Sequence, residues 1–134
     1  MRTALVALLL ALPACVGAPT REDPPPATPD ALVSRVRVLT VDERWSALYD
    51  LLSARQKEQI SRLEFVLGFS SYTVAPGYRV ADVIKGGQFL GAIENAESDK
   101  GIVYYTYSEP GRPRLDAQVE VICEDGAWRL DGVR

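Results

Sequence analysis

The chain has 134 residues, 47% of them hydrophobic and 25% charged, enough for one globular domain and a short leader. It contains no histidine, which excludes Ser-His-Asp and Cys-His catalysis and histidine-based zinc sites. The formal charge is −3, whereas a nucleic-acid binder needs a basic stripe to neutralise phosphates. We therefore expect no metal, no cofactor and no nucleic-acid partner.

The first 14 residues have the pattern of a bacterial signal peptide. Arg2 supplies one positive charge, and Ala4 to Leu12 is an apolar run. A bilayer span takes about 20 apolar residues, so this run is too short for one. It ends in Leu12-Pro13-Ala14-Cys15, which resembles the bacterial lipobox: a leucine three places before a cysteine, with a small residue just before the cysteine. The resemblance implies diacylglyceryl transfer to the Cys15 thiol and cleavage just before it.

An ordinary secretory cleavage after Val16-Gly17-Ala18 is the alternative, because small residues at alternate positions suit that peptidase. It would place Pro19 directly after the cut, which such peptidases resist. We expect Cys15 to be acylated and to anchor the chain to the bilayer of a bacterial cell envelope, at the outer membrane if the source has two membranes. Cys123 then lacks a partner in the chain and is expected to be a small buried hydrophobe.

Residues 15–29 are expected to form a flexible tether behind the lipidated cysteine. The segment contains Pro19, the run Pro24-Pro25-Pro26 and several charged residues, and it lacks large apolar side chains after Val16. Such a composition buries too little surface to fold by itself and favours an extended spacer. The folded domain is therefore predicted over residues 30–134.

The first predicted helix begins at Thr28-Pro29-Asp30, which supplies a hydroxyl cap, a proline at the first helical position and a first-turn carboxylate. Leu32, Val36 and Leu39 then recur at helical spacing. Residues 35–38 also alternate as a strand would, so a strand is the alternative there.

Further helices are predicted up to Gly68. Residues 42–53 carry one apolar stripe against a polar face and predict a helix; the stripe consists of Trp45, Leu48, Tyr49 and Leu52. Helical character continues over residues 55–60. Ser61-Arg62-Leu63-Glu64 fits a capping box and predicts a last short helix that ends near Gly68.

From Tyr72 onward the composition is that of strands and turns, with Pro-Gly, Gly-Gly and Asp-Gly pairs between β-branched and aromatic runs. The predicted strands are residues 89–95, 102–108, 115–123 and 128–133. Residues 80–84 fit either a strand or a helical turn, and Asp125-Gly126 predicts a tight hairpin. Helices followed by an antiparallel sheet predict an α+β domain.

Three stretches in order carry a family resemblance: Trp45-x-x-Leu48-Tyr49-x-Leu51-Leu52-Ser53, Ser61-x-x-Glu64-Phe65 and Glu124-Asp125-Gly126-x-Trp128-Arg129-Leu130. They resemble the nuclear transport factor 2-like superfamily. More narrowly, they are similar to the small cone-shaped domains of bacterial lipoproteins and of the amino-terminal region of some penicillin-binding proteins. The resemblance spans Asp30 to Arg134. It implies amino-terminal helices packed into the concave face of a curved antiparallel sheet, with room for a pocket.

Aromatic side chains are the candidate lining of such a pocket. Alternation along a strand places Tyr105 and Tyr107 on one face and Tyr104 on the other. Tyr49 projects from the same stripe as Trp45. We therefore take Trp45, Tyr49, Tyr105 and Tyr107 as candidate pocket residues, with aromatic packing in the core as the simpler alternative.

The sequence favours binding over catalysis. The superfamily includes ketosteroid isomerase-like enzymes, whose aspartate base, tyrosine and protonated carboxyl group need no histidine. Here Asp116 and Glu120 alternate outward, Asp99 falls in a turn and Asp82 falls in an ambiguous segment, so we assign no catalytic residue. We expect an envelope lipoprotein that binds a protein or a small apolar ligand. A lyase or isomerase, an accessory of cell-wall synthesis and a secreted domain without lipid are the alternatives.

Overall fold

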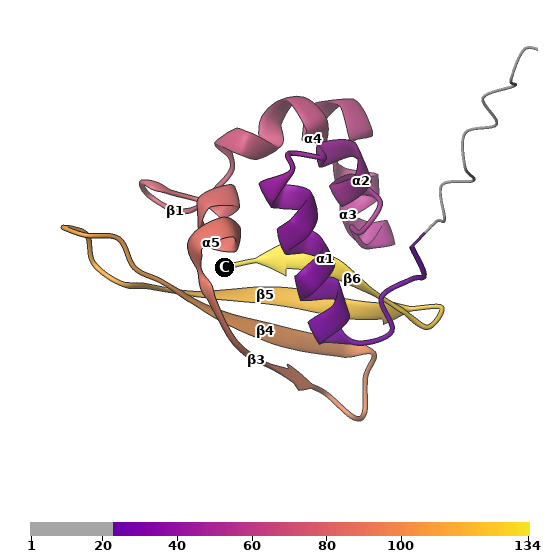
Figure 1. Ribbon diagram of the computed structural model, residues 1–134. Helices are drawn as coiled ribbons and strands as arrows, with labels where there is room; N and C mark the ends of the chain where they lie inside the picture. The colour runs from indigo at the N-terminus through magenta and orange to yellow at the C-terminus, as the bar shows by residue number, and fades with distance from the viewer. Residues whose placement is uncertain (1–22) are drawn as a thin grey trace, which may run out of the picture.

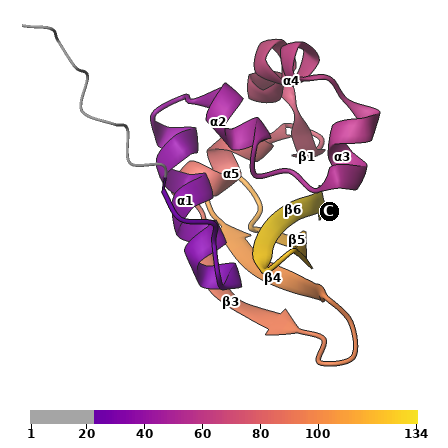
Figure 2. The same ribbon diagram turned by 90° about the vertical axis from the view of Figure 1, so that its right-hand side faces the viewer.

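The computed structural model describes residues 23–134. The predicted signal peptide, Cys15 and the tether up to residue 22 lie outside the described residues. The described part is α+β, as the sequence predicted: helices cover one face of a four-stranded antiparallel sheet (Figure 1). Figure 2 shows how strongly that sheet twists beneath the helical layer.

The helical elements are α1 (Pro29–Val41), α2 (Trp45–Tyr49), α3 (Ala54–Gln59), α4 (Arg62–Gly68), the 3-10 turn η1 (Phe69–Ser71) and α5 (Val80–Gly86). A short ribbon precedes α5 and is formed by β1 (Thr73–Ala75) and β2 (Tyr78–Arg79). The main sheet has the order β3-β4-β5-β6, made of β3 (Gln88–Glu94), β4 (Lys100–Tyr107), β5 (Leu115–Glu124) and β6 (Ala127–Val133).

Local signals in the sequence place the ends of several elements correctly. The Thr28 side chain accepts a hydrogen bond from the Ala31 amide at 3.1 Å, which caps α1 as predicted. The capping box of α4 is also present: Ser61 Oγ accepts from the Glu64 amide at 3.2 Å, and Glu64 Oε2 accepts from the Ser61 amide at 3.1 Å. The segment 80–84, which the sequence left open, is helical within α5.

The predicted pairing of the sheet strands is confirmed. Tyr105 of β4 lies opposite Ala117 of β5, and the strands of the main sheet follow one another as antiparallel neighbours. The hairpin between β5 and β6 turns at Asp125 and Gly126, whose φ angles of 51° and 78° lie in the left-handed region that Asp and Gly tolerate. Alternate residues of β4 and β5 therefore face the helices and form the buried side of the sheet.

The single helix predicted over residues 42–53 is wrong, because α2 is shorter and a pairing with the sheet interrupts it. Leu52 forms a parallel bridge with Leu130 of β6. The Ser53 amide donates to the Leu130 carbonyl at 2.7 Å, and the Leu130 amide donates to the Leu51 carbonyl at 2.8 Å. A long-range pairing of the backbone thus overrides the helical spacing of the sequence.

Ser53 joins α3 to β6 through its side chain as well. The residue is 1% exposed; its hydroxyl accepts from the Gln56 amide at 3.2 Å and donates to Asp131 Oδ1 at 2.6 Å. Arg55 pairs with Asp131 Oδ2 at 3.1 Å. Burial alone would raise the pKa of the Asp131 carboxyl, but hydrogen bonds from Arg55 and Ser53 outweigh it and lower that pKa. We call residues 51–56 with Leu130 and Asp131 the α3–β6 junction.

The boundary predicted between tether and domain at residue 30 is also wrong. Pro26 is fully buried, and its carbonyl accepts a hydrogen bond from the Trp128 amide at 2.8 Å. The Pro24 carbonyl accepts from the Arg35 guanidinium. Proline lacks an amide hydrogen but keeps its carbonyl and an apolar ring, so a proline-rich segment can dock in this way. Contacts with the domain therefore extend upstream of α1 to at least Pro24.

Two serines of similar local geometry allow the α3–β6 junction to be tested. We expect Ser53→Ala to lower the free energy of unfolding by about 2 kcal/mol, because it removes a helix cap and a buried hydrogen bond to a carboxylate. Ser61→Ala removes a cap that is exposed to solvent and is expected to cost about 1 kcal/mol. Urea unfolding followed by circular dichroism measures both, and equal losses would contradict the role given to Ser53.

Candidate functional site

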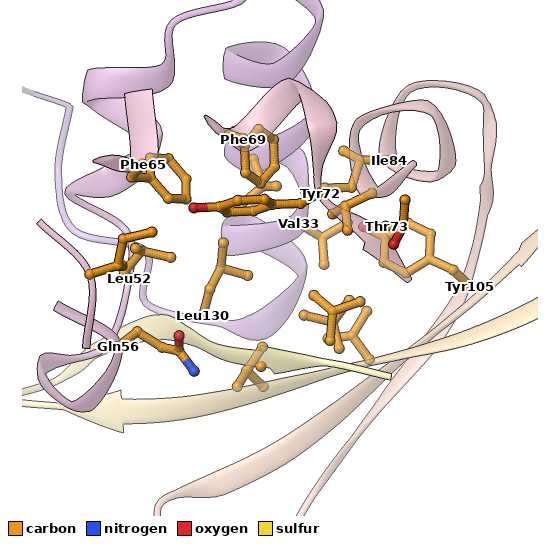
Figure 3. A pocket seen from close by; sticks show the side chains of 18 of the residues that line it. Val33, Leu52, Gln56, Phe65, Phe69, Tyr72, Thr73, Ile84, Tyr105 and Leu130 are labelled. Atoms are coloured by element: carbon orange, nitrogen blue, oxygen red, sulfur yellow. The ribbon is translucent and has the colours of Figure 1, made fainter. Parts of the chain in front are cut away.

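A cavity of about 530 Å³ lies between the helical layer and the inward face of the sheet (Figure 3). Natural ligand pockets have volumes of about 300 to 1,000 Å³ and predominantly apolar linings. Most of the described lining is aliphatic or aromatic: Val33, Val36, Leu52, Ile60, Phe65, Phe69, Tyr72, Val80, Ile84, Val103, Tyr105, Val119, Val121, Leu130 and Val133. The size and the lining therefore match those of a site for a small apolar molecule.

The floor of the pocket is formed by side chains of β4 and β5, which alternate between the two faces of the sheet. Val103 and Tyr105 face the helices from β4, and Val119 and Val121 face them from β5. Leu130 enters from β6 through the α3–β6 junction, which brings Leu52 to the same cavity. The junction thus fixes one side of the pocket.

An aromatic cluster forms the wall opposite this floor, as Figure 3 shows for Phe65, Phe69 and Tyr72. The ring centroids of Phe65 and Phe69 are 4.9 Å apart, and those of Phe69 and Tyr72 are 5.8 Å apart. None of the three was among the predicted pocket residues. The signal was present in the sequence, because they recur at i, i+4 and i+7 directly after the capping box at Ser61.

Of the four aromatic residues predicted to line a pocket, the structure places Tyr105 in the lining. Trp45 lies outside it and packs on Phe69, with ring centroids 5.1 Å apart. Tyr49 is 8% exposed and also lies outside, since its hydroxyl donates to the Ile60 carbonyl at 2.8 Å. Both belong to the apolar stripe that the sequence predicted, but these two side chains pack against residues of the helical layer.

Tyr107 shares the inward face of β4 with Tyr105 but lies outside the lining. Its ring packs edge-on against Tyr78, with centroids 6.2 Å apart, and its hydroxyl donates to the Glu109 carboxylate. That hydrogen bond is the main reason that the pKa of Tyr107 is raised to about 12. The sequence predicted the face of this residue correctly and its place in the pocket wrongly.

Tyr105 is the most buried polar residue of the lining, with 5% of its surface exposed. Among residues 23–134 no hydrogen-bond partner is found for its hydroxyl; it packs near Phe89, whose ring centroid is 5.9 Å away. Burial raises the pKa of Tyr105 to about 12, although the charge of Arg37 acts in the opposite direction. The phenol therefore stays neutral and keeps an unused donor inside the pocket.

The remaining polar side chains of the described lining are nearer to solvent or already paired. Gln56 is half-buried, and its Nε2 donates to the Asp131 carbonyl at 2.6 Å. Tyr72 is half-buried, and burial raises its pKa. Gln59, Thr73 and Val133 are exposed, so the cavity opens to the surface beside them.

The described lining contains no Asp, Glu, Lys or Arg. The isomerase alternative requires a carboxylate base inside the pocket, but Asp82, Asp99, Asp116 and Glu120 all lie outside the lining. Within residues 23–134 no three side chains gather as candidate metal ligands. None of the helices described in this range has the length and apolar character needed to cross a membrane.

Neither a protein-family model nor a curated protein matches the chain. Among solved structures, the chain is similar to the solution structure of a SEC-C motif-containing protein from Rhodopseudomonas palustris. The TM-score is 0.51 at 11% sequence identity, and the match covers 81% of this chain and 78% of the other. At this identity the similarity concerns the fold alone, and it agrees with the α+β arrangement described above.

The burial of Tyr105 predicts a pH dependence of stability. The pKa of this phenol rises from 10.0 to about 12 in the folded chain, so its stabilising contribution is complete below pH 10 and is lost as the pH rises toward 12. We expect Tyr105→Phe to lose less stability than the wild type between about pH 9 and pH 11.5 in urea unfolding. Tyr104→Phe, on the opposite face of β4, is the control and should follow the wild type; a Tyr105→Phe curve as steep as the wild type would contradict the assignment.

Proposed function

We propose that the chain is a bacterial envelope lipoprotein, anchored through an acylated Cys15, whose domain binds a small apolar ligand between its helices and its sheet. The cavity of about 530 Å³ with its apolar lining is the observation that carries the binding function. Cavities of this kind are the usual sites of small-molecule binding. The anchor rests on the sequence Leu12-Pro13-Ala14-Cys15.

The choice of side chains around the cavity supports binding over simple core packing. Valine is the commonest residue of the described lining, and it contributes from α1, α5 and three strands of the sheet. Each further methylene buried in a core contributes about 0.8 kcal/mol, so a sequence selected only for stability would place larger side chains here. Short aliphatic side chains instead leave space, and a ligand that fills it gains the contacts that the protein does not make itself.

A cone-shaped, nuclear transport factor 2-like domain is the fold that we propose in detail. The order β3-β4-β5-β6, the helices on one face and the pocket between the two layers support it. In such a domain the pocket occupies the concave side of the sheet.

The docked prolines shorten the reach of the proposed anchor. Pro24 contacts α1 and lies nine residues beyond Cys15. A fully extended chain spans at most about 3.3 to 3.6 Å per residue, so the domain would lie within roughly 30 Å of the lipid attachment point. An acylated Cys15 would therefore hold the pocket close to the bilayer surface, where apolar molecules are concentrated.

The anchor is tested with the two cysteines of the chain. We expect the wild-type chain and Cys123→Ser to sediment with membranes, and Cys15→Ser to be lost from them, because only Cys15 follows the lipobox-like motif. Mass spectrometry of the mature amino terminus should find a diacylglyceryl group on Cys15. A free amino terminus at Pro19, or an unmodified Cys15, would favour the secreted alternative and would leave the pocket unaffected.

Binding is tested by filling the mouth of the pocket. Val133 lines it and is 43% exposed, so Val133→Trp adds volume at a position where the chain tolerates it. We expect this variant to bind the neutral fluorescent dye N-phenyl-1-naphthylamine about tenfold more weakly than the wild type, a difference of about 1.4 kcal/mol. The matched control is Leu90→Trp, another exposed strand residue, outside the lining. Equal binding by both variants would contradict the proposed site.

A further inference from the structure

The hydroxyl group of Tyr105 is the feature of the pocket that its apolar packing does not explain. Tyr105 is 5% exposed, and its hydroxyl has no hydrogen-bond partner among residues 23–134. This hydroxyl keeps some accessible surface, because Thr106 Oγ1 is the one fully buried side-chain oxygen or nitrogen without a partner among the described residues. Water can therefore reach the Tyr105 hydroxyl through the open pocket, but a ligand that fills the pocket displaces this water, and a donor then left without a partner costs about 1 to 3 kcal/mol. The other polar side chains of the described lining are half-buried or exposed, so bulk water can satisfy them when a ligand is bound.

We infer that the ligand is an uncharged apolar molecule with one oxygen acceptor, such as a ketone, ester or ether oxygen, which accepts a hydrogen bond from Tyr105. This inference rests on the proposed ligand-binding function and specifies the chemistry of the ligand. The acceptor would lie at the end of the pocket away from Gln56, where Figure 3 shows Tyr105. The apolar body of the ligand would extend from there between the aromatic wall and the aliphatic floor.

The charge of the ligand follows from the charges around the pocket. The described lining contains no basic side chain that could pair with a carboxylate, and a buried carboxylate without a partner costs several kcal/mol. Arg37 is the cation that acts on Tyr105, but its guanidinium is exposed and donates to the Lys85 carbonyl at 3.3 Å. Arg37 also lies outside the lining, so it does not offer an ion pair inside the pocket.

The ligand body is defined by what faces it. Phe65, Phe69 and Tyr72 present rings on one side, and Leu130 lies on the other (Figure 3). Rings on one side and branched aliphatic side chains on the other suit a flat hydrocarbon, because both surfaces gain contacts along its length. A naphthalene ring system is therefore a suitable body for probes that differ in one substituent.

Three probes with the same ring system separate the contributions of the apolar body, the oxygen acceptor and a negative charge to binding. They are 2-ethylnaphthalene, 2-acetylnaphthalene and 2-naphthoate. Each competes with N-phenyl-1-naphthylamine for the full chain in a neutral detergent, where partitioning into detergent is the same for every variant. We expect 2-acetylnaphthalene to compete best and 2-naphthoate worst. Tyr105→Phe should weaken the competition by 2-acetylnaphthalene about 5- to 10-fold. The competition by 2-ethylnaphthalene should stay within about twofold of its wild-type value.

Two matched variants and one spectrum test whether Tyr105 itself donates to the ligand. Tyr104→Phe on the outward face of β4 and Tyr107→Phe, on the inward face but outside the lining, should leave the competition by 2-acetylnaphthalene unchanged. The carbonyl stretching band of bound 2-acetylnaphthalene should lie at a lower frequency in the wild type than in Tyr105→Phe, because donation from the phenol weakens the C=O bond. That shift reports the contact directly and does not depend on affinity.

The outcomes distinguish this inference from the function on which it rests. If 2-acetylnaphthalene and 2-ethylnaphthalene compete equally, or if Tyr107→Phe weakens the competition by 2-acetylnaphthalene as much as Tyr105→Phe does, the role of Tyr105 is wrong while the pocket stands. If 2-naphthoate competes best, the ligand is not uncharged. If the dye itself does not bind to the wild-type chain, the proposed binding function fails together with the inference.

Discussion

The α3–β6 junction holds the helical layer on the sheet, and the pocket depends on it. Leu51 and Ser53 exchange backbone hydrogen bonds with Leu130, and the Ser53 side chain adds a contact to Asp131. These bonds stop α2 early and turn the chain so that Leu52 and Gln56 reach the cavity together with Leu130. The junction therefore sets the separation between the helices and the sheet, and that separation is the depth of the pocket.

A domain of this size meets two competing demands in its interior. Close packing stabilises the chain, whereas a ligand site requires space that side chains leave unfilled. Here the aromatic packing of Trp45, Tyr49 and Tyr107 lies outside the lining, and short valine side chains face the cavity. Core residues such as Phe65 and Leu52 nevertheless face the cavity, so the residues that would contact a ligand also stabilise the fold.

Local chemistry determines which parts of the structure the sequence predicted. The caps at Thr28 and Ser61 and the hairpin at Asp125 involve residues only a few positions apart, so the chain segment alone determines them. The end of α2 depends on a bridge to Leu130, and the start of the domain depends on the docking of Pro26, which no local pattern reveals. Likewise, alternation predicted the face of each strand tyrosine, but which aromatic side chains border a space depends on how the layers pack.

The long separation in sequence between the two sides of the α3–β6 junction has a consequence for folding. Residues 51–56 contact Leu130 and Asp131, almost eighty positions further along the chain, so the junction closes a large loop. Contacts of this kind form late and slow the folding of a domain. An amino-terminal half that emerges first cannot complete its core, and it would remain pliable until β6 is made. For a chain that crosses a membrane as an extended polymer, as the proposed lipoprotein would, late closure would keep the polypeptide competent for transport until its last strand has passed.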